Sequence, residues 1–281
     1  MEPVLINGIP SPYVSVADRG LHYGDGLFET IACAGTHPLF IEQHLKRMQS
    51  GARILDIAFP DRESILDDIK TLLQNNSDSK SIIKLILTRG QGKRGYRYDT
   101  AQIPTRVCML SAWPAHVAQW KRQGMTTRFC ETQASINPGL SGIKTLNRLE
   151  NVLASSELGS GFDEGFLSDI DGNVIEGTMS NIFAVIDGVL VTPDLSRCGV
   201  RGIMREQIIA SAHQRGIGVE TVSLSREDLM KSQEIFVSNS VIGLCNVKQL
   251  EQRSFNCTVM TETLNAELEK RIDADAKTAA Y

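Results

Sequence analysis

SGIKTLNRLE, at residues 141–150, is the stretch on which the fold and chemistry of this sequence depend most. It follows a loop rich in glycine and proline and places Lys144 between the apolar side chains of Ile143 and Leu146. We predict a helix from Thr145 to Leu158, which sets Lys144 one residue before its start. Apolar surroundings disfavour the charged form of a lysine and make its amine nucleophilic, as Schiff-base chemistry requires. The ordinary alternative is an exposed lysine at a helix start, and this stretch alone favours that alternative.

Three polar segments after Lys144 are candidates for ligand contacts. Glu176 ends a predicted strand in the stretch EGTMSNIF at 176–183, where a carboxylate can reach a ligand in a cleft. The stretch GVRGIMR at 199–205 is a glycine-spaced turn that opens into a helix and exposes backbone N–H groups to an anion. VSNSV at 237–241 ends a strand with hydroxyl groups that could bind phosphate. Each segment alone is better explained as a solvated strand end, a tight turn or turn serines.

The composition is that of an ordinary soluble globular protein. The chain of 281 residues is 42% hydrophobic and 22% charged, with a formal net charge of −4. This length allows two domains around a cleft. No run dense in lysine and arginine indicates a nucleic-acid or membrane surface, which argues weakly against a polyanion-binding protein.

Sequence signals for export, membrane insertion and metal binding are missing. Residues 1–4 lack the pattern of a secretory signal, and no apolar stretch reaches the roughly 18 residues of a membrane span. The six cysteines have no C-x-x-C spacing and the five histidines have no metal-ligand spacing. We therefore expect a cytoplasmic protein with reduced thiols and no bound metal.

Hydrophobic periodicity predicts an α+β fold in two domains. The predicted helices are 41–57, 63–74, 145–158, 203–215 and 261–276, and the predicted strands are 82–87, 106–112, 125–131, 219–223 and 234–238. Hairpin turns are predicted at Asn7-Gly8, Asp171-Gly172 and Asp187-Gly188, and a capping box at Ser225 and Asp228.

The break after Trp113-Pro114 predicts the boundary between the domains. We expect a smaller N-terminal α+β domain at 1–113, a linker at 114–124 and a larger α+β domain at 125–281 that carries Lys144.

Together and in this order, the segments resemble the class IV (branched-chain and D-amino-acid) aminotransferase family. The resemblance begins with DRGLHYGDGLFE at 18–29 and continues through the stretches at 176–183 and 199–205, over nearly the whole chain. It implies a fold-type IV enzyme with pyridoxal 5'-phosphate between two α+β domains, and a homodimer.

The resemblance also implies a role for individual residues. Lys144 would hold the cofactor as a Schiff base and act as the catalytic residue, and Glu176 would face the pyridine nitrogen and keep it protonated. Arg47 would pair with the cofactor phosphate. The other residues expected at the cofactor are Gly202, Ile203, Met204, Ser240 and Asn181, and those expected at the substrate include Tyr23 and Phe28.

Two local motifs resemble the aminodeoxychorismate lyase branch of that family. They are KTLNRLE at 144–150 and TRGQGKRGY at 88–96. Leu149 stands where branched-chain aminotransferases usually have a tyrosine, which counts against that subgroup. Asn147 does not separate the lyase branch from the D-amino-acid enzymes, because both share the lysine–x–x–asparagine pattern. This branch converts 4-amino-4-deoxychorismate to 4-aminobenzoate and pyruvate in folate biosynthesis. A D-amino-acid or branched-chain aminotransferase is the main alternative, and a non-catalytic cofactor-binding protein is another.

A dicarboxylate substrate requires cationic groups. Arg94 and Arg148 are the candidates for its two carboxylates, with other cations at Arg89, Lys93 and Arg97. Solvated surface charge is the ordinary explanation for most of these side chains.

Overall fold

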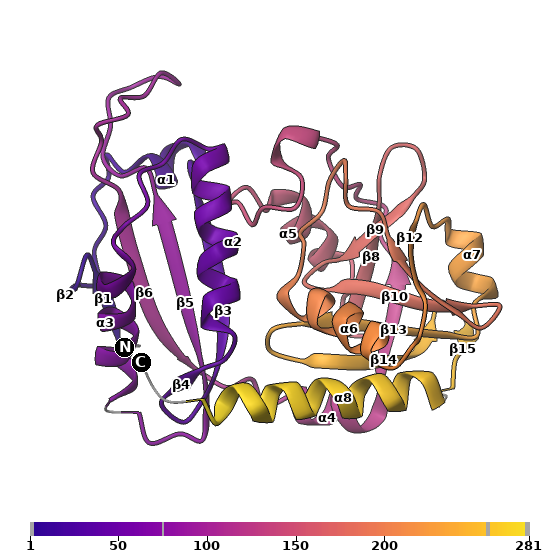
Figure 1. Cartoon of the computed structure of the whole chain (residues 1–281). Coiled ribbons are helices and arrows are strands. Elements are labelled where there is room, and N and C mark those ends of the chain that lie inside the picture. The colour runs from indigo at the N-terminus through magenta and orange to yellow at the C-terminus, as the bar shows by residue number, and fades with distance from the viewer. Residues whose placement is uncertain (1–2, 75, 257–258, 279–281) are drawn as a thin grey trace. The chain divides into compact units, whose positions relative to one another are not determined.

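The computed structural model describes residues 3–74, 76–256 and 259–278. Contacts divide the chain into two compact units, which are described separately. Unit 1 comprises Met1–Pro114, Ile143–Asn147 and Ile272–Tyr281, and unit 2 comprises Ala115–Gly142 and Arg148–Arg271. Both units mix helices with a sheet, which confirms the predicted α+β class (Figure 1).

Unit 1 is built on a six-stranded sheet in the order β2-β1-β6-β5-β3-β4, with every neighbouring pair antiparallel. Its long central strands are β3, β5 and β6, and helix α2 packs on β3. The strands are β1 (Val4–Ile6), β2 (Ile9–Pro10), β3 (Gly26–Ala34), β4 (His37–Pro38), β5 (Lys80–Thr88) and β6 (Thr105–Ala112), and the helices are α1 (Arg19–Tyr23), α2 (Ile41–Ile54) and α3 (Arg62–Leu73).

Unit 2 is built on a nine-stranded mixed sheet in the order β12-β11-β10-β13-β14-β7-β8-β9, with β15 paired to β14. Stacked Phe183 and Phe236, fully buried on adjacent strands, lie in its core. The strands are β7 (Met125–Phe129), β8 (Glu164–Ser168), β9 (Val174–Gly177), β10 (Asn181–Ile186), β11 (Val189–Pro193), β12 (Val219–Val222), β13 (Glu234–Asn239), β14 (Gly243–Leu250) and β15 (Arg253–Ser254). The helices are α4 (Val117–Gln123), α5 (Leu149–Ser156), α6 (Ile203–Gln214), α7 (Arg226–Lys231) and α8 (Val259–Ala276), with the 3-10 turn η1 (Pro138–Leu140).

Local sequence signals are confirmed where they act over a few residues. The hairpins turn at Asn7-Gly8, Asp171-Gly172 and Asp187-Gly188. The glycine of each pair has a positive φ. Ser225 and Asp228 form the predicted capping box of α7. These motifs are stabilised by contacts within one turn, so neighbouring residues are enough to specify them.

The predicted helix at 145–158 is wrong in its first turn, because α5 begins at Leu149. The backbone of residues 144–146 pairs with β3 instead: Phe28 N–H donates to the Lys144 carbonyl and Leu146 N–H to the Gly26 carbonyl, both at 3.0 Å. This pairing places the lysine segment in unit 1, whereas we expected it in a C-terminal domain. The expected linker at 114–124 also contains a helix, α4.

Among the described residues, no helix is both long and apolar enough to cross a membrane. In this part of the chain, five cysteines are thiols without a disulfide bond. Cys257, and the first two of residues 1–4 used above to judge an export signal, lie outside the described residues.

Candidate functional site

Lys144 is held by strand pairing beside an aromatic ring. Its side chain is half-buried, and its Nζ lies 4.5 Å from the centroid of the Phe28 ring. Thr145 forms an isolated antiparallel bridge with Leu27, so the backbone from the Lys144 carbonyl to Leu146 is fixed to β3. Structure thus brings together two of the residues predicted from sequence, Lys144 and Phe28, and gives the amine the apolar neighbour that nucleophilic chemistry favours.

Arg47 is fixed by a buried glutamate that sequence reasoning missed. Its Nε donates to Glu29 Oε1 at 2.8 Å and its Nη2 to Glu29 Oε2, while His44 Nδ1 lies 2.6 Å from the same carboxylate. Burial raises the pKa of Glu29, but Arg47 and His44 overcome that effect and lower the pKa to about 2. The carboxylate is therefore ionised, and from β3 it orients the guanidinium of Arg47, which belongs to α2. A charged residue within the apolar run of β3 was the signal that could have identified it.

Replacing Glu29 with glutamine is expected to reduce the free energy of unfolding by about 3 kcal/mol at pH 7, since it breaks a buried ion pair. The folded-state pKa lies below the ordinary value of 4.5, so the contribution of Glu29 is present above pH 4.5. It is lost as the pH falls toward 2. Urea unfolding of wild type and E29Q should show that the difference between their free energies of unfolding decreases as the pH falls from 7 to 2.5.

A matched control is E42Q, because Glu42, on α2 like Arg47, pairs with Arg62 of α3 in solvent. That change is expected to shift the free energy of unfolding by less than about 1 kcal/mol. Equal stability of E29Q and wild type at pH 7 would contradict the role given to the buried pair.

Glu176 is buried in β9 and is tied to the turn before α6. Its Oε2 accepts a 2.8 Å hydrogen bond from the Val200 N–H, and Asn181 Nδ2 donates to the Val200 carbonyl at 2.9 Å. Both predicted residues therefore meet at one backbone position of unit 2. The ordinary explanation for Glu176, a solvated strand end, does not fit a side chain that is 7% exposed.

The start of α6 is suited to an anion. Gly202 is the N-cap residue, no side chain caps the helix, and Ile203 and Met204 form its first turn. An added Cβ at Gly202 would lie 2.0 Å from Asn181 Oδ1, so only glycine allows Asn181 to approach this turn. A helix N-terminus without a side-chain cap directs backbone N–H groups and a partial positive charge at a ligand.

The end of β13 carries the predicted hydroxyl groups. Ser240 is half-buried one residue after this strand, and Ser238 lies opposite Asn181 in the register of β10 and β13. Ser238 Oγ is buried and has no hydrogen-bond partner. A buried hydroxyl without a partner is costly, which makes Ser238 a further candidate for a ligand contact.

A second buried glutamate, Glu164, was also missed from the sequence. It accepts hydrogen bonds from Thr178 N (2.9 Å), Thr178 Oγ1 (2.5 Å) and Ser180 Oγ (2.7 Å). Burial raises its pKa. These bonds fix the polar loop between Glu176 and Asn181, so Glu164 orders a predicted site segment from outside it.

The predicted substrate residues are distributed over both units. Tyr23 is half-buried at the end of α1, and Arg94 is exposed on the loop between β5 and β6, both in unit 1. Arg148 belongs to unit 2, where it is the half-buried N-cap residue of α5. The Tyr23 hydroxyl accepts a 3.0 Å hydrogen bond from Gly95 N–H, which connects Tyr23 with the Arg94 loop.

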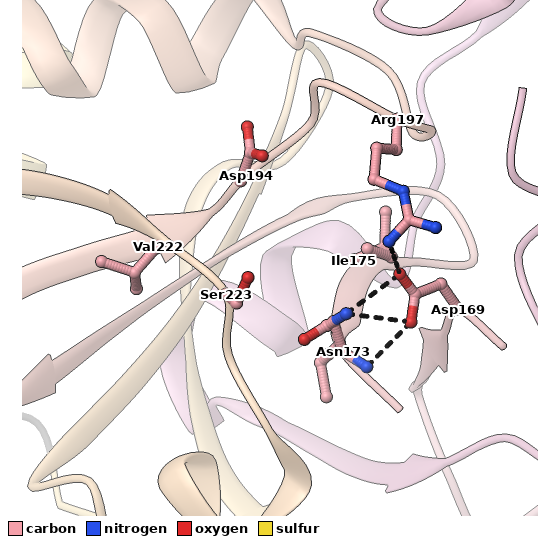
Figure 2. A pocket seen from close by; sticks show the side chains of 8 residues that line it. Asp169, Asn173, Ile175, Asp194, Arg197, Val222 and Ser223 are labelled. Atoms are coloured by element: carbon pink, nitrogen blue, oxygen red, sulfur yellow. Dashed lines mark hydrogen bonds and ion pairs between the residues drawn. The ribbon is translucent and has the colours of Figure 1, made fainter. Parts of the chain in front are cut away.

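A small pocket in unit 2 contains none of the predicted site residues (Figure 2). It lies at the β8–β9 turn, where Asp169 accepts hydrogen bonds from both nitrogens of Asn173 and from Asp171 N–H. Val174 and Ile175 of β9 line this pocket, whereas Glu176, the next residue of that strand, does not. The hydrogen bonds to the Asp169 carboxylate therefore stabilise the turn.

Comparison with known proteins connects this geometry to one family. The family model for amino-transferase class IV matches residues 26–250. The aminodeoxychorismate lyase of Vibrio harveyi is 33% identical over 243 residues, which is 86% of this chain and 89% of that protein. A putative branched-chain-amino-acid aminotransferase of Methanocaldococcus jannaschii is 32% identical over 246 residues, covering 86% of this chain and 84% of that protein.

A solved structure extends the likeness to the whole fold. The 4-amino-4-deoxychorismate lyase from Pseudomonas aeruginosa superposes with a TM-score of 0.90 and 36% identity, over 96% of this chain and 99% of that one. The extent of these matches shows that the chain belongs to the class IV aminotransferase family of pyridoxal-phosphate-dependent enzymes.

Proposed function

We propose that this protein is an aminodeoxychorismate lyase, which converts 4-amino-4-deoxychorismate to 4-aminobenzoate and pyruvate for folate biosynthesis. The observation that carries the proposal is the likeness to two bacterial lyases, at 33% and 36% identity over 86% and 96% of this chain. The alternative is amino transfer from a D-amino acid or branched-chain amino acid. It is supported by the 32% identity to a putative branched-chain aminotransferase.

The residues of each unit suit pyridoxal phosphate. In unit 1 the Lys144 amine lies against the Phe28 ring, and Arg47 has a guanidinium oriented by Glu29. In unit 2 the helix start at Gly202 and the hydroxyl of Ser238, which has no partner, suit phosphate oxygens. We propose that one cofactor molecule is held by Lys144, Arg47, Glu176, Asn181, Gly202, Ile203, Met204 and Ser240, with Ser238 added to the phosphate contacts.

Lys144 and Glu176 would have the two central tasks. Pyridoxal phosphate, when bound, supplies an electron sink for negative charge on the carbon beside the substrate nitrogen. Glu176 would hold a proton at the pyridine nitrogen, because a buried carboxylate favours the cationic ring. Lys144 would anchor the cofactor through Nζ and, once displaced by the substrate amine, would be available to move protons.

The proposed reaction is an elimination with no change in oxidation state. Lys144 Nζ would take the proton from the ring carbon that bears nitrogen, and the carbon–oxygen bond to the enolpyruvyl group would break. That proton, returned by Lys144 to the methylene carbon of the leaving group, would give pyruvate. The ring becomes aromatic, which makes the step strongly downhill, and 4-aminobenzoate is the second product. No 2-oxo acid is consumed.

The substrate carries two carboxylates, and unit 1 offers cations on the loop after β5. Arg94 would bind one carboxylate, with Tyr23 and Phe28 beside the substrate, and Arg148 would bind the other. We further propose that the protein acts as a homodimer in the cytoplasm. Light scattering of the purified protein tests the dimer.

Substrate preference discriminates between the proposed function and the alternative. The proposal predicts that kcat/KM for aminodeoxychorismate exceeds that for amino transfer from D-alanine or leucine to 2-oxoglutarate by at least about 100-fold. Both rates are measured on the same holoenzyme preparation, by 4-aminobenzoate fluorescence and by glutamate formation. The reverse order would make the protein an aminotransferase.

A further inference from the structure

The DRG motif at residues 18–20 has no part in the chemistry proposed above, yet its arginine is buried. Arg19 and Arg89 are each 4% exposed, and both donate through Nε to Asp25 Oδ2 at 2.8 Å. Burial raises the pKa of Asp25, but hydrogen bonds from Arg89 and Arg19 lower it below its ordinary value. One ionised carboxylate therefore joins two buried guanidinium groups, and we call these three residues the Asp25 hub.

Each arginine of the Asp25 hub holds a different segment of backbone. Arg89 donates to the carbonyls of Leu55 and Asp56 after α2, both at 2.6 Å. Arg19 donates from Nη1 to the Gly95 carbonyl at 2.8 Å and from Nη2 to the Tyr96 carbonyl at 3.2 Å. The second set of bonds anchors the loop 92–98, which carries the exposed cations Lys93, Arg94 and Arg97.

Aromatic and backbone contacts complete the anchoring of this loop. Tyr23 accepts from Gly95 N–H, lies 4.8 Å below the Arg19 guanidinium and contacts the Tyr96 ring at 5.5 Å between centroids. The Arg89 guanidinium lies 3.7 Å from the centroid of the Tyr98 ring. At the start of the loop, Gly92 packs so closely that an added Cβ would lie 2.7 Å from Arg19 Cδ.

We propose that Arg19 is a positioning residue, which holds loop 92–98 in one conformation and thereby sets the affinity of the protein for a dicarboxylate. The inference rests on the proposed function for the identity of the substrate. A planar guanidinium can bridge Asp25 and two carbonyl groups at once, whereas an ammonium group cannot match this fork. A loop held before binding loses little conformational entropy when the substrate arrives.

The test compares R19K and R19M with wild-type holoenzyme. R19K keeps a positive charge beside Asp25 and so separates loop anchoring from folding. Hydrogen exchange at Gly92 and Gly95, whose N–H groups bond to Ala17 O and Tyr23 Oη, reports on the loop. Affinity is measured by calorimetry with chorismate, which has two carboxylates but no amine to react.

Both variants are expected to exchange faster at Gly95 and to bind chorismate about 10-fold more weakly. That factor is the loss of affinity expected when the population of the binding-competent loop conformation falls to about a tenth. KM for aminodeoxychorismate should rise by the same factor, with kcat changed less than about 3-fold. R106K is the matched control: it alters an ion pair of the same unit, in which Arg106 Nε donates to Asp68 of α3 rather than to loop 92–98. It should leave loop exchange and chorismate affinity unchanged.

Unchanged exchange at Gly95 in R19K overturns the anchoring, and faster exchange with unchanged chorismate affinity overturns its link to binding. If only R19K folds, it decides the question alone. The lyase assignment fails on a different result, the absence of product from aminodeoxychorismate in wild type. Chorismate binding and loop exchange still test the role of Arg19 in that case.

Discussion

Replacing Lys144 with alanine is expected to abolish covalent attachment of the cofactor and to reduce kcat/KM for aminodeoxychorismate by at least about 10³-fold. One amine would serve as anchor, base and acid, so its removal eliminates three roles at once. The segment is held by backbone pairing with β3, which a side-chain truncation leaves in place. Borohydride reduction followed by mass spectrometry measures the attachment, and 4-aminobenzoate fluorescence measures the rate.

Lys84 provides the matched control, because its Nζ lies 5.5 Å from the centroid of the same Phe28 ring. K84A is expected to retain the attached cofactor and wild-type turnover within about 3-fold. Retained turnover in K144A, or loss of attachment in K84A alone, would assign the chemistry to a different amine.

Glutamine at position 176 is expected to reduce kcat by roughly 10²–10³-fold, which corresponds to about 3–4 kcal/mol of transition-state stabilisation. An amide oxygen can still accept the hydrogen bond from Val200 N–H, so the turn before α6 should remain in place. An amide cannot hold the pyridine nitrogen in its protonated form as a carboxylate does. Steady-state kinetics measures the loss, and equilibrium dialysis of the cofactor measures its affinity, which should change by less than about 10-fold.

Glu251 is a suitable control in unit 2, because its carboxylate also accepts a backbone N–H, from Phe129 at 2.7 Å. E251Q preserves that bond in the same way and should leave kcat unchanged. If E176Q keeps wild-type kcat, the residue supports the turn and has no role at the pyridine nitrogen.

Sequence was sufficient for features that depend on short spacings. The helix start at Gly202, the position of Glu176 in a strand and the hairpin turns all follow from side chains within a few residues. The same holds for the hydroxyl groups at the end of β13, although Ser238 rather than Ser240 is the one whose hydroxyl is buried without a partner.

Long-range pairing could not be predicted from those spacings. Lys144 and Leu146 are good helix formers, but tertiary pairing with β3, more than a hundred residues earlier in the chain, overrides that propensity. Strands β3 and β14 were not predicted, since a glycine-containing polar motif and mixed burial hide their alternation. The partners of Glu29 and Arg19 come from other segments, so the linear sequence does not show which groups these two residues bind.

The lyase assignment is tested most directly by counting product molecules per protein chain from aminodeoxychorismate with no 2-oxo acid present. Fluorescence measures 4-aminobenzoate, and coupled lactate dehydrogenase measures pyruvate. The proposed elimination predicts equal amounts of both products, increasing together through more than about 100 turnovers per chain. A burst of at most one product per chain, which resumes only when a 2-oxo acid is added, would contradict the lyase and identify an aminotransferase.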